Sequence, residues 1–241
     1  MNWLTRLHFL GRAWRHRLSR DRLGIAFILA RDLRGKVSVD VGANQGVYSY
    51  WMCRRAVGTA GRVVAFEPQP ELAAYLRDLR ESFHLHQLEV AESALSAQPG
   101  ALTLRRPKTH WGGASLEHLP GDHGEVDLIP VTVTTLDSYF QNHVARPIKF
   151  IKCDVEAHEH HVFRGAHSIL TNDRPDLLFE CYDAANPYCE VVNYLNDLDY
   201  QGYCFFGNRL APLAEYAALR PHMNKAALYD FVFLPQETSP P

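Results

Sequence analysis

From Lys36 onward, the chain alternates between short runs rich in β-branched residues and longer stretches with helical spacing. Strands are expected at Val37–Val41, Arg62–Phe66, Leu88–Leu95, Ile148–Asp154, Leu177–Glu180, Tyr203–Phe206 and Tyr229–Leu234. Helices are expected at Val47–Val57, Pro70–Phe83, Glu159–Leu170 and Pro187–Leu198. Strands that alternate with helices predict an α/β fold in which helices cover both faces of a mostly parallel sheet. Because parallel strands are joined by right-handed crossovers, few topologies are possible.

Residues 97–135 interrupt this alternation. Ala101–Arg105 and Leu128–Val133 alternate apolar and polar residues with the period of two that is typical of strands. A connection rich in Gly, His and Pro separates them, so we predict an inserted antiparallel β-pair. Thr134 followed by Asp137 has the spacing of a helix capping box, and we expect a structural role for this pair.

The first 35 residues are predicted to form a basic helical extension. Residues 1–36 hold eight arginines and one lysine against two aspartates, although the whole chain has a formal net charge of −2. Apolar residues follow one helical stripe: Trp3, Leu7, Leu10, Trp14 and Leu18. Such a stripe usually faces a core, so we expect the helix to pack on the domain. Peripheral contact of residues 1–18 with an anionic membrane, or binding of an acidic acceptor, are the alternatives.

Composition limits the rest of the chain to one domain at 36–235, followed by a flexible tail at 236–241. The longest uncharged apolar run, Leu23–Ala30, is much shorter than the roughly 20 residues of a membrane-spanning helix, and it leads into charged residues. The five cysteines show neither disulfide nor zinc spacing. These features predict a cytoplasmic protein, with the inner membrane surface as the alternative location.

Two glycines, Gly42 and Gly46, lie between the first expected strand and the helix that begins at Val47. Glycines let the backbone approach a ligand closely, and a helix N-terminus offers free N–H groups to carboxylates or phosphates. In open α/β sheets, ligands bind at such turns beyond the carboxyl ends of strands. The spacing lacks the middle glycine of the dinucleotide-binding motif, which argues against a nicotinamide cofactor.

Glu67 closes the second expected strand, 21 residues beyond Gly46. A carboxylate there can accept hydrogen bonds from both hydroxyl groups of a ribose that lies over the glycine turn. The alternative for Glu67 is a solvated acid near a helix N-terminus. Together with the glycine turn, Glu67 predicts a ligand that contains a nucleoside.

These motifs resemble those of class I S-adenosylmethionine-dependent methyltransferases and, more narrowly, of the FkbM family. The resemblance begins with Asp40–Gly46 and Phe66–Pro68. It continues, in family order, through Ser93–Ser96, Val133–Asp137, Phe150–Glu156, Val162–Ala166 and the strand that ends at Glu180. It implies a doubly wound, Rossmann-like sheet over roughly residues 37–235, with S-adenosylmethionine as methyl donor and S-adenosylhomocysteine as product. Ala157 departs from the family motif, which has glycine there, and His158–His161 is unusually rich in histidine.

The resemblance also implies which residues bind the cofactor. They are Asp40, Gly42, Ala43, Asn44, Gly46, Glu67, Glu92, Ser93 and Asp154. The glycine turn would hold the methionine part and Glu67 the ribose, while Glu92 and Ser93 would lie near the adenine. Asp154 would face the sulfonium, where a carboxylate can stabilise positive charge. The alternative for Asp154 is an ordinary helix N-cap.

Transfer of a methyl group to a hydroxyl needs alignment and a base that takes the proton. Glu156, His158, Glu180 and His110 are the candidate bases. We expect Asp154, Glu156 and His158 to be the catalytic residues, because His158 follows the acid of the fourth strand closely and imidazole ionises near neutral pH. Asp154, Glu156, His158 and Glu180 could also ligate a divalent metal, but they show no recognised metal spacing, so no metal is predicted.

The predicted function is therefore S-adenosylmethionine-dependent O-methylation of a small molecule, a sugar or a glycolipid. The alternatives are an NAD(P)-dependent oxidoreductase and a cofactor-binding scaffold without catalysis. We expect no nucleic-acid partner, since the domain is acidic and has no nucleic-acid-binding motif.

Overall fold

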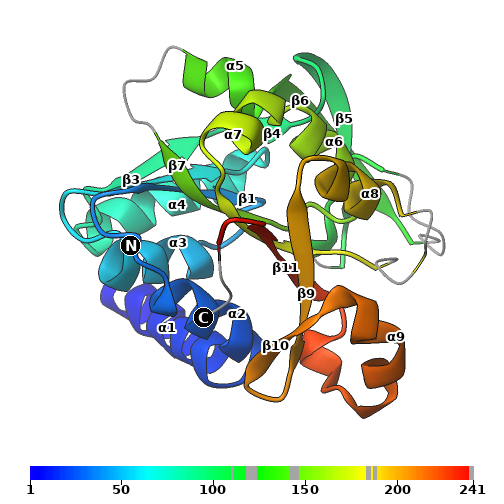
Figure 1. Cartoon of the computed structure of the whole chain (residues 1–241). Coiled ribbons are helices and arrows are strands. Elements are labelled where there is room, and N and C mark those ends of the chain that lie inside the picture. Colours follow the sequence, from blue (N-terminus) through cyan, green and yellow to red (C-terminus); the bar gives the residue numbers. More distant parts are fainter. Residues whose placement is uncertain (110, 118–123, 142–146, 183–185, 187–188, 239–241) are drawn as a thin grey trace.

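The computed structural model describes residues 1–109, 111–117, 124–141, 147–182, 186 and 189–238. Within them, one large sheet has the strand order β10-β9-β11-β8-β7-β1-β2-β3 (Figure 1). Its strands are β1 (Val37–Val41), β2 (Arg62–Phe66), β3 (Leu88–Ala91), β7 (Ile148–Cys153), β8 (Asp176–Glu180), β9 (Tyr200–Phe206), β10 (Arg209–Pro212) and β11 (Asp230–Pro235). The five neighbouring strands β8, β7, β1, β2 and β3 are parallel to one another. Strand β11 runs antiparallel to both β8 and β9. The predicted α/β class and mostly parallel sheet are confirmed.

Helices cover both faces of this sheet (Figure 1). One apolar cluster joins the sheet to α1 (Trp3–Arg15), α2 (Arg22–Ala30), α3 (Val47–Trp51) and α4 (Pro70–Ser82). A second cluster joins the opposite face to α5 (Leu136–Gln141), α6 (Glu159–Arg164), α7 (His167–Asn172), α8 (Glu190–Asp197) and α9 (Tyr216–Leu219). All five residues of β1 are buried, because the strand is central and covered on both sides.

Two predicted helices differ from the observed ones. The helix expected at Val47–Val57 continues from α3 as a π-helical turn at Met52–Ala56. The helix expected at Glu159–Leu170 is divided into α6 and α7 at Gly165. A side chain at Gly165 would collide with the backbone oxygen of Ser96. Glycine at this break therefore lets the chain at Ser96 pack closely against the junction of the two helices.

The insertion forms a second, smaller sheet in the order β4-β6-β5. Its strands are β4 (Ala94–Leu95), β5 (Gly100–Pro107) and β6 (Val126–Thr134). Strands β5 and β6 pair antiparallel, as predicted. The single strand expected at Leu88–Leu95 is wrong: its first half is an edge of the large sheet, and its second half pairs with β6. The insertion therefore leaves the main sheet at the carboxyl end of β3.

Asp137 does not complete the predicted capping box. The hydroxyl of Thr135 accepts the hydrogen bond from the Ser138 backbone N–H at 3.0 Å. The carboxylate of Asp137 instead accepts from the backbone N–H groups of Ser168 and Ile169, at 2.8 and 3.0 Å. Asp137 thus stabilises the start of α7 and holds two helices together.

The N-terminal extension packs on the domain, but with a different face from the one predicted. Phe9 and Ala13 are the buried residues of α1; the Phe9 ring packs edge-on against Tyr50, with centroids 5.2 Å apart. The indole N–H of Trp51 donates to the backbone oxygen of Ala13 at 3.1 Å. Most of the predicted stripe faces outward, since Trp3, Leu7, Trp14 and Leu18 are 67, 56, 45 and 66% exposed, whereas Leu10 packs against the core.

All five cysteines are buried free thiols. Among the described residues, no helix combines the length and the apolar character needed to cross a bilayer. At the start of the predicted tail, Glu237 accepts two hydrogen bonds from Arg174 at 2.8 and 3.1 Å, and residues 239–241 lie outside the described residues.

Candidate active site

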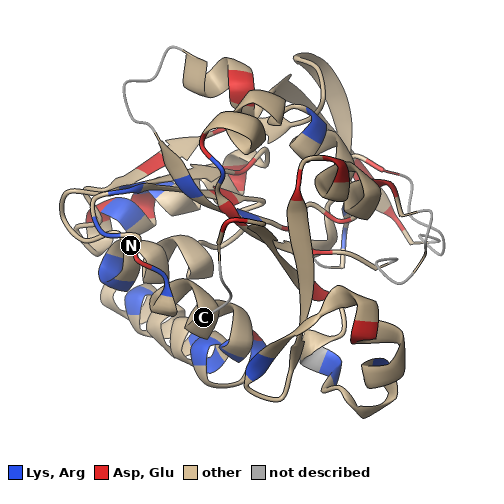
Figure 2. Ribbon diagram, in the orientation of Figure 1, with Lys and Arg blue, Asp and Glu red and all other residues tan. Residues whose placement is uncertain are grey.

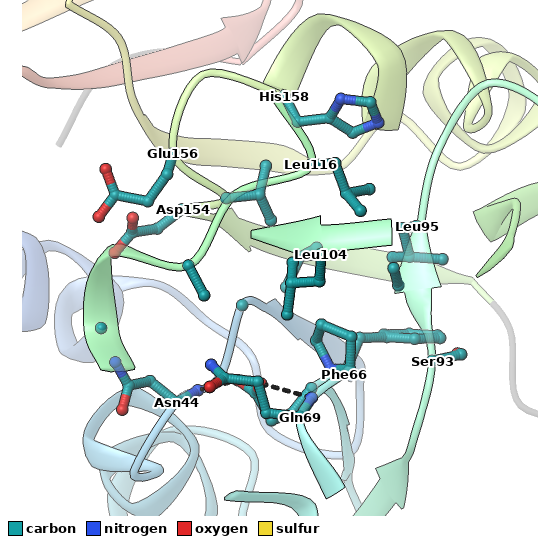
Figure 3. A pocket seen from close by; sticks show the side chains of 18 residues that line it. Asn44, Phe66, Gln69, Ser93, Leu95, Leu104, Leu116, Asp154, Glu156 and His158 are labelled. Atoms are coloured by element: carbon teal, nitrogen blue, oxygen red, sulfur yellow. Dashed lines mark hydrogen bonds between the residues drawn. The ribbon is translucent and has the colours of Figure 1, made fainter. Parts of the chain in front are cut away.

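A pocket lies at the carboxyl ends of β1, β2 and β7, where the β5–β6 connection reaches back over them (Figure 3). Five predicted cofactor-binding residues line it: Gly42, Asn44, Glu67, Ser93 and Asp154. The predicted catalytic residues Glu156 and His158 line it as well. The topology explains this gathering, because neighbouring parallel strands end at the same edge of the sheet.

The glycine turn after β1 needs glycine for two different reasons. Gly42 has a φ of +70°, and a side chain there would collide with the backbone oxygen of Asp154. Gly46, with a φ of +75°, leaves room for Leu76 and Leu79 of α4, which a side chain would approach to 2.6 and 2.8 Å. Gly42 therefore borders the pocket, whereas Gly46 serves the packing of α4.

Glu67 is only 3% exposed, and its side chain holds the glycine turn that follows β1. Its two carboxylate oxygens accept from the backbone N–H groups of Asn44 and Gln69, at 2.8 and 3.0 Å. Burial raises the pKa of Glu67, and these hydrogen bonds oppose that shift.

Gln69 supplies an unsatisfied acceptor beside this carboxylate. Its side-chain Nε2 donates to the backbone oxygen of Trp111 at 3.2 Å, which orients the amide. Its Oε1 is buried and has no hydrogen-bond partner in the described part of the chain. Since buried polar groups are nearly always paired, this oxygen is available to accept a hydrogen bond from a ligand at this end of the pocket.

Three further predicted cofactor residues do not line the pocket. Asp40 is fully buried below the turn, where its Oδ2 accepts from the Ser49 hydroxyl at 2.6 Å and burial raises its pKa. Glu92 lies at the surface in an ion pair with Arg77, 2.8 Å long. Ala43 borders a neighbouring groove. Direct binding by these residues stays a prediction.

Asp154 follows β7 and does not cap a helix. Helix α6 begins only at Glu159, with His158 as the cap residue. The backbone N–H of Asp154 donates to Val41 at 3.1 Å, and its side chain is 41% exposed. The structure thus excludes the N-cap alternative and leaves the carboxylate facing the pocket (Figure 3).

Lys152 ties the floor of the site together. Its buried Nζ lies 3.3 Å from Asp154 Oδ2 and 3.7 Å from Asp40 Oδ1, and it donates to the Gly42 backbone oxygen at 3.3 Å. Burial favours the neutral amine, but the two carboxylates hold the pKa of Lys152 above its usual value. Sequence analysis missed this residue; its position two residues before Asp154, on the same face of β7, was the available signal.

Three carboxylates crowd together beside Asp154. One oxygen each of Asp154, Glu156 and Glu180 lies within 4.8 Å of the others. Burial and the charges of Asp154 and Glu156 raise the pKa of Glu180 to about 8. The Tyr182 hydroxyl donates to Glu156 at 3.2 Å. Glu180 is therefore suited to accept a proton near neutral pH.

Both ring nitrogens of His158 are engaged. Nδ1 lies 2.6 Å from Glu117 Oε1, and Nε2 lies 3.0 Å from the Ser96 hydroxyl. Burial lowers the pKa of His158. His158 thus joins the β5–β6 connection to the end of β4, and its catalytic role stays a prediction. The other candidate histidine, His110, lies outside the described residues.

Among the described residues, two groups of side chains could hold a metal ion. One is the carboxylate cluster, whose oxygens are the ligand type that divalent cations prefer. The other combines Glu117, His158 and His161. Neither has a recognised metal-binding spacing in the sequence, and the expectation of a metal-free site stays a prediction.

The sequence model of the Methyltransferase FkbM domain matches residues 40–201, more than half of the chain. The chain belongs to the FkbM methyltransferase domain family. The matched segment contains every residue predicted to bind the cofactor or to act in catalysis, so the resemblance based on Asp40–Gly46 and Phe66–Pro68 is confirmed. Membership favours a methyltransferase over the alternative of an NAD(P)-dependent oxidoreductase.

Solved structures show the same fold at low identity. An FkbM methyltransferase from Methylobacillus flagellatus has a TM-score of 0.52 and 17% identity, and the match covers 82% of this chain and 43% of that one. An O-methyltransferase from Bacillus cereus, solved with S-adenosylhomocysteine, has a TM-score of 0.52 and 14% identity over 97% of this chain and 90% of that one. The chain thus spans less than half the length of the Methylobacillus protein. No curated protein matches the sequence.

The remaining wall of the pocket in this FkbM-family domain was not predicted. Phe66 and Leu95 come from the ends of strands, whereas Leu104 and Leu116 come from the insertion (Figure 3). The hydroxyl of Ser115 donates to the backbone oxygen of Glu156 at 2.6 Å and holds the insertion in place. Leu104 and Leu116 could not be predicted to line the pocket, because no spacing in the sequence indicates where an inserted hairpin folds back.

Proposed function

We propose that this protein transfers a methyl group from S-adenosylmethionine to a hydroxyl of a small molecule, a sugar or a glycolipid. One observation carries the proposal: a single pocket combines a buried carboxylate and an unsatisfied amide oxygen at one end with the Asp154 carboxylate at the other. When bound, S-adenosylmethionine supplies a methyl group activated by a positively charged sulfur.

The adenosine end of the pocket fits a nucleoside. Glu67 retains lone pairs for ribose hydroxyls, and Gln69 Oε1 can accept from a hydroxyl or amino group. The apolar side chains of Phe66, Leu95 and Leu104 offer a surface for the base. Family membership supports the same assignment.

At the other end, Asp154 would stabilise positive charge next to the reacting methyl group. Glu180 is the proposed base, because its carboxylate lies within 4.8 Å of those of Asp154 and Glu156 and its pKa, raised to about 8, makes its ionised form a strong acceptor for the hydroxyl proton. Glu156 belongs to the same carboxylate cluster, lines the pocket and would help to orient the acceptor. We assign His158 a positioning role, because both of its nitrogens already have partners.

Calorimetric titration with S-adenosylhomocysteine and with NAD tests the donor assignment. We expect binding of the first and none of the second; the reverse would overturn the proposal. Incubation with methyl-labelled S-adenosylmethionine and extracts of the source cells then tests catalysis. Label in an acceptor supports the enzyme, whereas tight cofactor binding without any labelled product supports the scaffold alternative.

A further inference from the structure

We call the pocket at the carboxyl ends of β1, β2 and β7 the donor pocket. A second cavity, of about 530 Å³, adjoins it. The two share Gly42, Asn44, Gly112 and Asp154 as lining residues. The far wall comes from the N-terminal extension, which contributes Arg12, Arg15 and Arg20. The extension precedes the segment that matches the family, yet it borders the space in front of Asp154. We call this cavity the arginine groove.

The arginine groove has an excess of positive charge. Its two lysines are paired within the protein, Lys152 with Asp154 at 3.3 Å and Lys108 with Glu125 at 2.9 Å, and Asp21 contacts the His16 ring at 2.8 Å. In the described part of the chain, Arg12, Arg15 and Arg20 have no carboxylate within ion-pair distance. Figure 2 shows that Lys and Arg gather along the end of the molecule formed by α1 and α2.

We propose that the arginine groove binds the methyl acceptor through an anionic group, a phosphate or a carboxylate. Guanidinium groups bind both of these with paired hydrogen bonds, and three of them match a multiply charged phosphate better than a single carboxylate. The acceptor is thus an anion whose hydroxyl lies near Asp154 while its charge lies among the arginines. This inference rests on the proposed methyltransferase function.

The test removes the three charges without altering the fold. Arg15 and Arg20 are exposed and Arg12 is half-buried, so a triple variant with Arg12→Gln, Arg15→Gln and Arg20→Gln should fold normally. The matched control carries Arg54→Gln, Arg55→Gln and Arg220→Gln, three exposed arginines outside the groove. Inorganic pyrophosphate is titrated by calorimetry into each protein at low salt, in the presence of S-adenosylhomocysteine.

Wild type and control should bind pyrophosphate, and the groove variant should bind it at least about tenfold more weakly, with unchanged affinity for S-adenosylhomocysteine. Wild type that ignores pyrophosphate would overturn the proposal. A groove variant that loses S-adenosylhomocysteine instead would assign the arginines to the carboxylate of the cofactor and overturn it too. If no protein binds S-adenosylhomocysteine, the proposed function fails, and the pyrophosphate titration still shows whether the groove binds anions.

Phosphatidic acid vesicles distinguish a lipid headgroup from a soluble anion. If the headgroup enters the groove, wild type binds the vesicles more tightly than the groove variant does, and pyrophosphate weakens vesicle binding by wild type but not by the groove variant. If pyrophosphate binds but does not compete with the vesicles, the acceptor is a soluble anion. Both results support an anionic acceptor and differ only in its source.

An independent observation concerns the outer face of α1 and of the π-helical turn that continues it at His16–Arg20. Nine large apolar side chains of the described residues are strongly exposed, and five of them lie between residues 3 and 18: Trp3, Leu4, Leu7, Trp14 and Leu18. We call them the outer stripe. Their spacing puts them on one side of the helix, away from the buried Phe9 and Ala13. Five arginines and no acid accompany them within residues 1–20.

We also infer that the outer stripe binds an anionic lipid bilayer. Apolar residues with tryptophan on one side and arginines beside them are typical of helices that lie in the membrane interface. The positive charge complements acidic headgroups and is repelled by other cationic surfaces. Binding through the outer stripe would orient the protein so that the arginine groove opens toward the membrane.

Flotation with mixed phosphatidylglycerol–phosphatidylcholine vesicles at low salt tests this inference. The variant with Leu4→Gln, Leu7→Gln and Leu18→Gln keeps every charge and should lower vesicle binding by at least about tenfold. The control changes two exposed leucines of the insertion, Leu102→Gln and Leu128→Gln, and should bind as wild type does. Equal binding by both variants would overturn the inference. So would a stripe variant that changes only the oligomeric state, since the stripe would then contact a second copy.

Discussion

The donor pocket and the arginine groove share Asp154 as a lining residue, but they differ in whether their charged side chains have partners within the protein. In the donor pocket, the buried Glu67 carboxylate accepts two backbone hydrogen bonds, from Asn44 and Gln69. In the groove, three arginines have no carboxylate partner among the described residues, and beside it Glu180 shares its surroundings with two other acids. The first region is assembled before a ligand arrives, whereas the second leaves charge for a ligand to neutralise.

This difference follows from where the two regions lie. The donor pocket grows from the ends of buried parallel strands, and a buried charge is tolerated only when the protein pairs it. The groove lies between the domain and an added helix, where water solvates the arginines.

The largest expected effect comes from Asp154→Asn, at the boundary of the two regions. The amide keeps the shape of the side chain but removes its charge, so methyl transfer should fall by roughly 10²-fold or more. Thermal unfolding should stay close to that of wild type, since the side chain is 41% exposed and caps no helix. A stable protein with near-normal turnover would remove Asp154 from catalysis.

Glu180→Gln tests the acceptor side, and we expect transfer to fall by about 10²-fold. In wild type, kcat/KM should rise with pH up to about 8, because the base works only when ionised. The variant should lack this rise. An unchanged pH profile would point to another base.

The same pKa shift predicts a stability effect with a definite sign. The folded protein holds a proton on Glu180 up to about pH 8, whereas the unfolded chain loses it near the ordinary value of 4.5. The contribution of Glu180 to the free energy of unfolding is therefore full below pH 4.5 and is lost as pH rises to about 8. Urea unfolding across this range should show a weaker pH dependence for Glu180→Gln.

Glu67→Ala tests the donor pocket alone. Loss of a charged acceptor should weaken S-adenosylhomocysteine binding by about 1–3 kcal/mol, measured by calorimetry. Glu92→Ala is the matched control: Glu92 pairs with Arg77 outside the pocket lining, so its loss should change affinity little. If Glu92→Ala weakens binding as much as Glu67→Ala, the predicted adenine contact exists after all and the pocket extends further than its lining indicates.

The smallest effect is expected at Ala157. It has a φ of +74°, directly after Glu156 at +54°, so two left-handed residues in succession carry the chain past the carboxylates. Ala157→Gly should stabilise the protein by about 1 kcal/mol, which corresponds to a rise in Tm of about 2–4 °C. Ala218→Gly, in α9, is the control and should destabilise slightly. A lower Tm for Ala157→Gly would mean that the alanine side chain contributes packing that outweighs the strain.

Much of the main sheet and of the donor pocket was predictable because their signals are local. Runs of β-branched residues indicated β1, β2 and β7, and parallel strands must end at a common edge, so Gly42, Glu67 and Asp154 had to lie close together. The family motifs lie in the same segments. Short-range periodicity and the geometry of parallel sheets therefore determined the donor pocket from the sequence.

The tertiary structure decided what depends on contacts between distant segments. The spacing of Trp3, Leu7, Trp14 and Leu18 indicated an amphipathic helix, but the shape of the domain selected Phe9 and Ala13 as the buried face. Sequence likewise could not show that Asp137 holds α7, that His158 pairs with Glu117, or that Lys152 joins Asp40 to Asp154. Periodicity specifies that a helix has two faces, whereas burial depends on which neighbouring surface is complementary, and that surface exists only once the chain has folded.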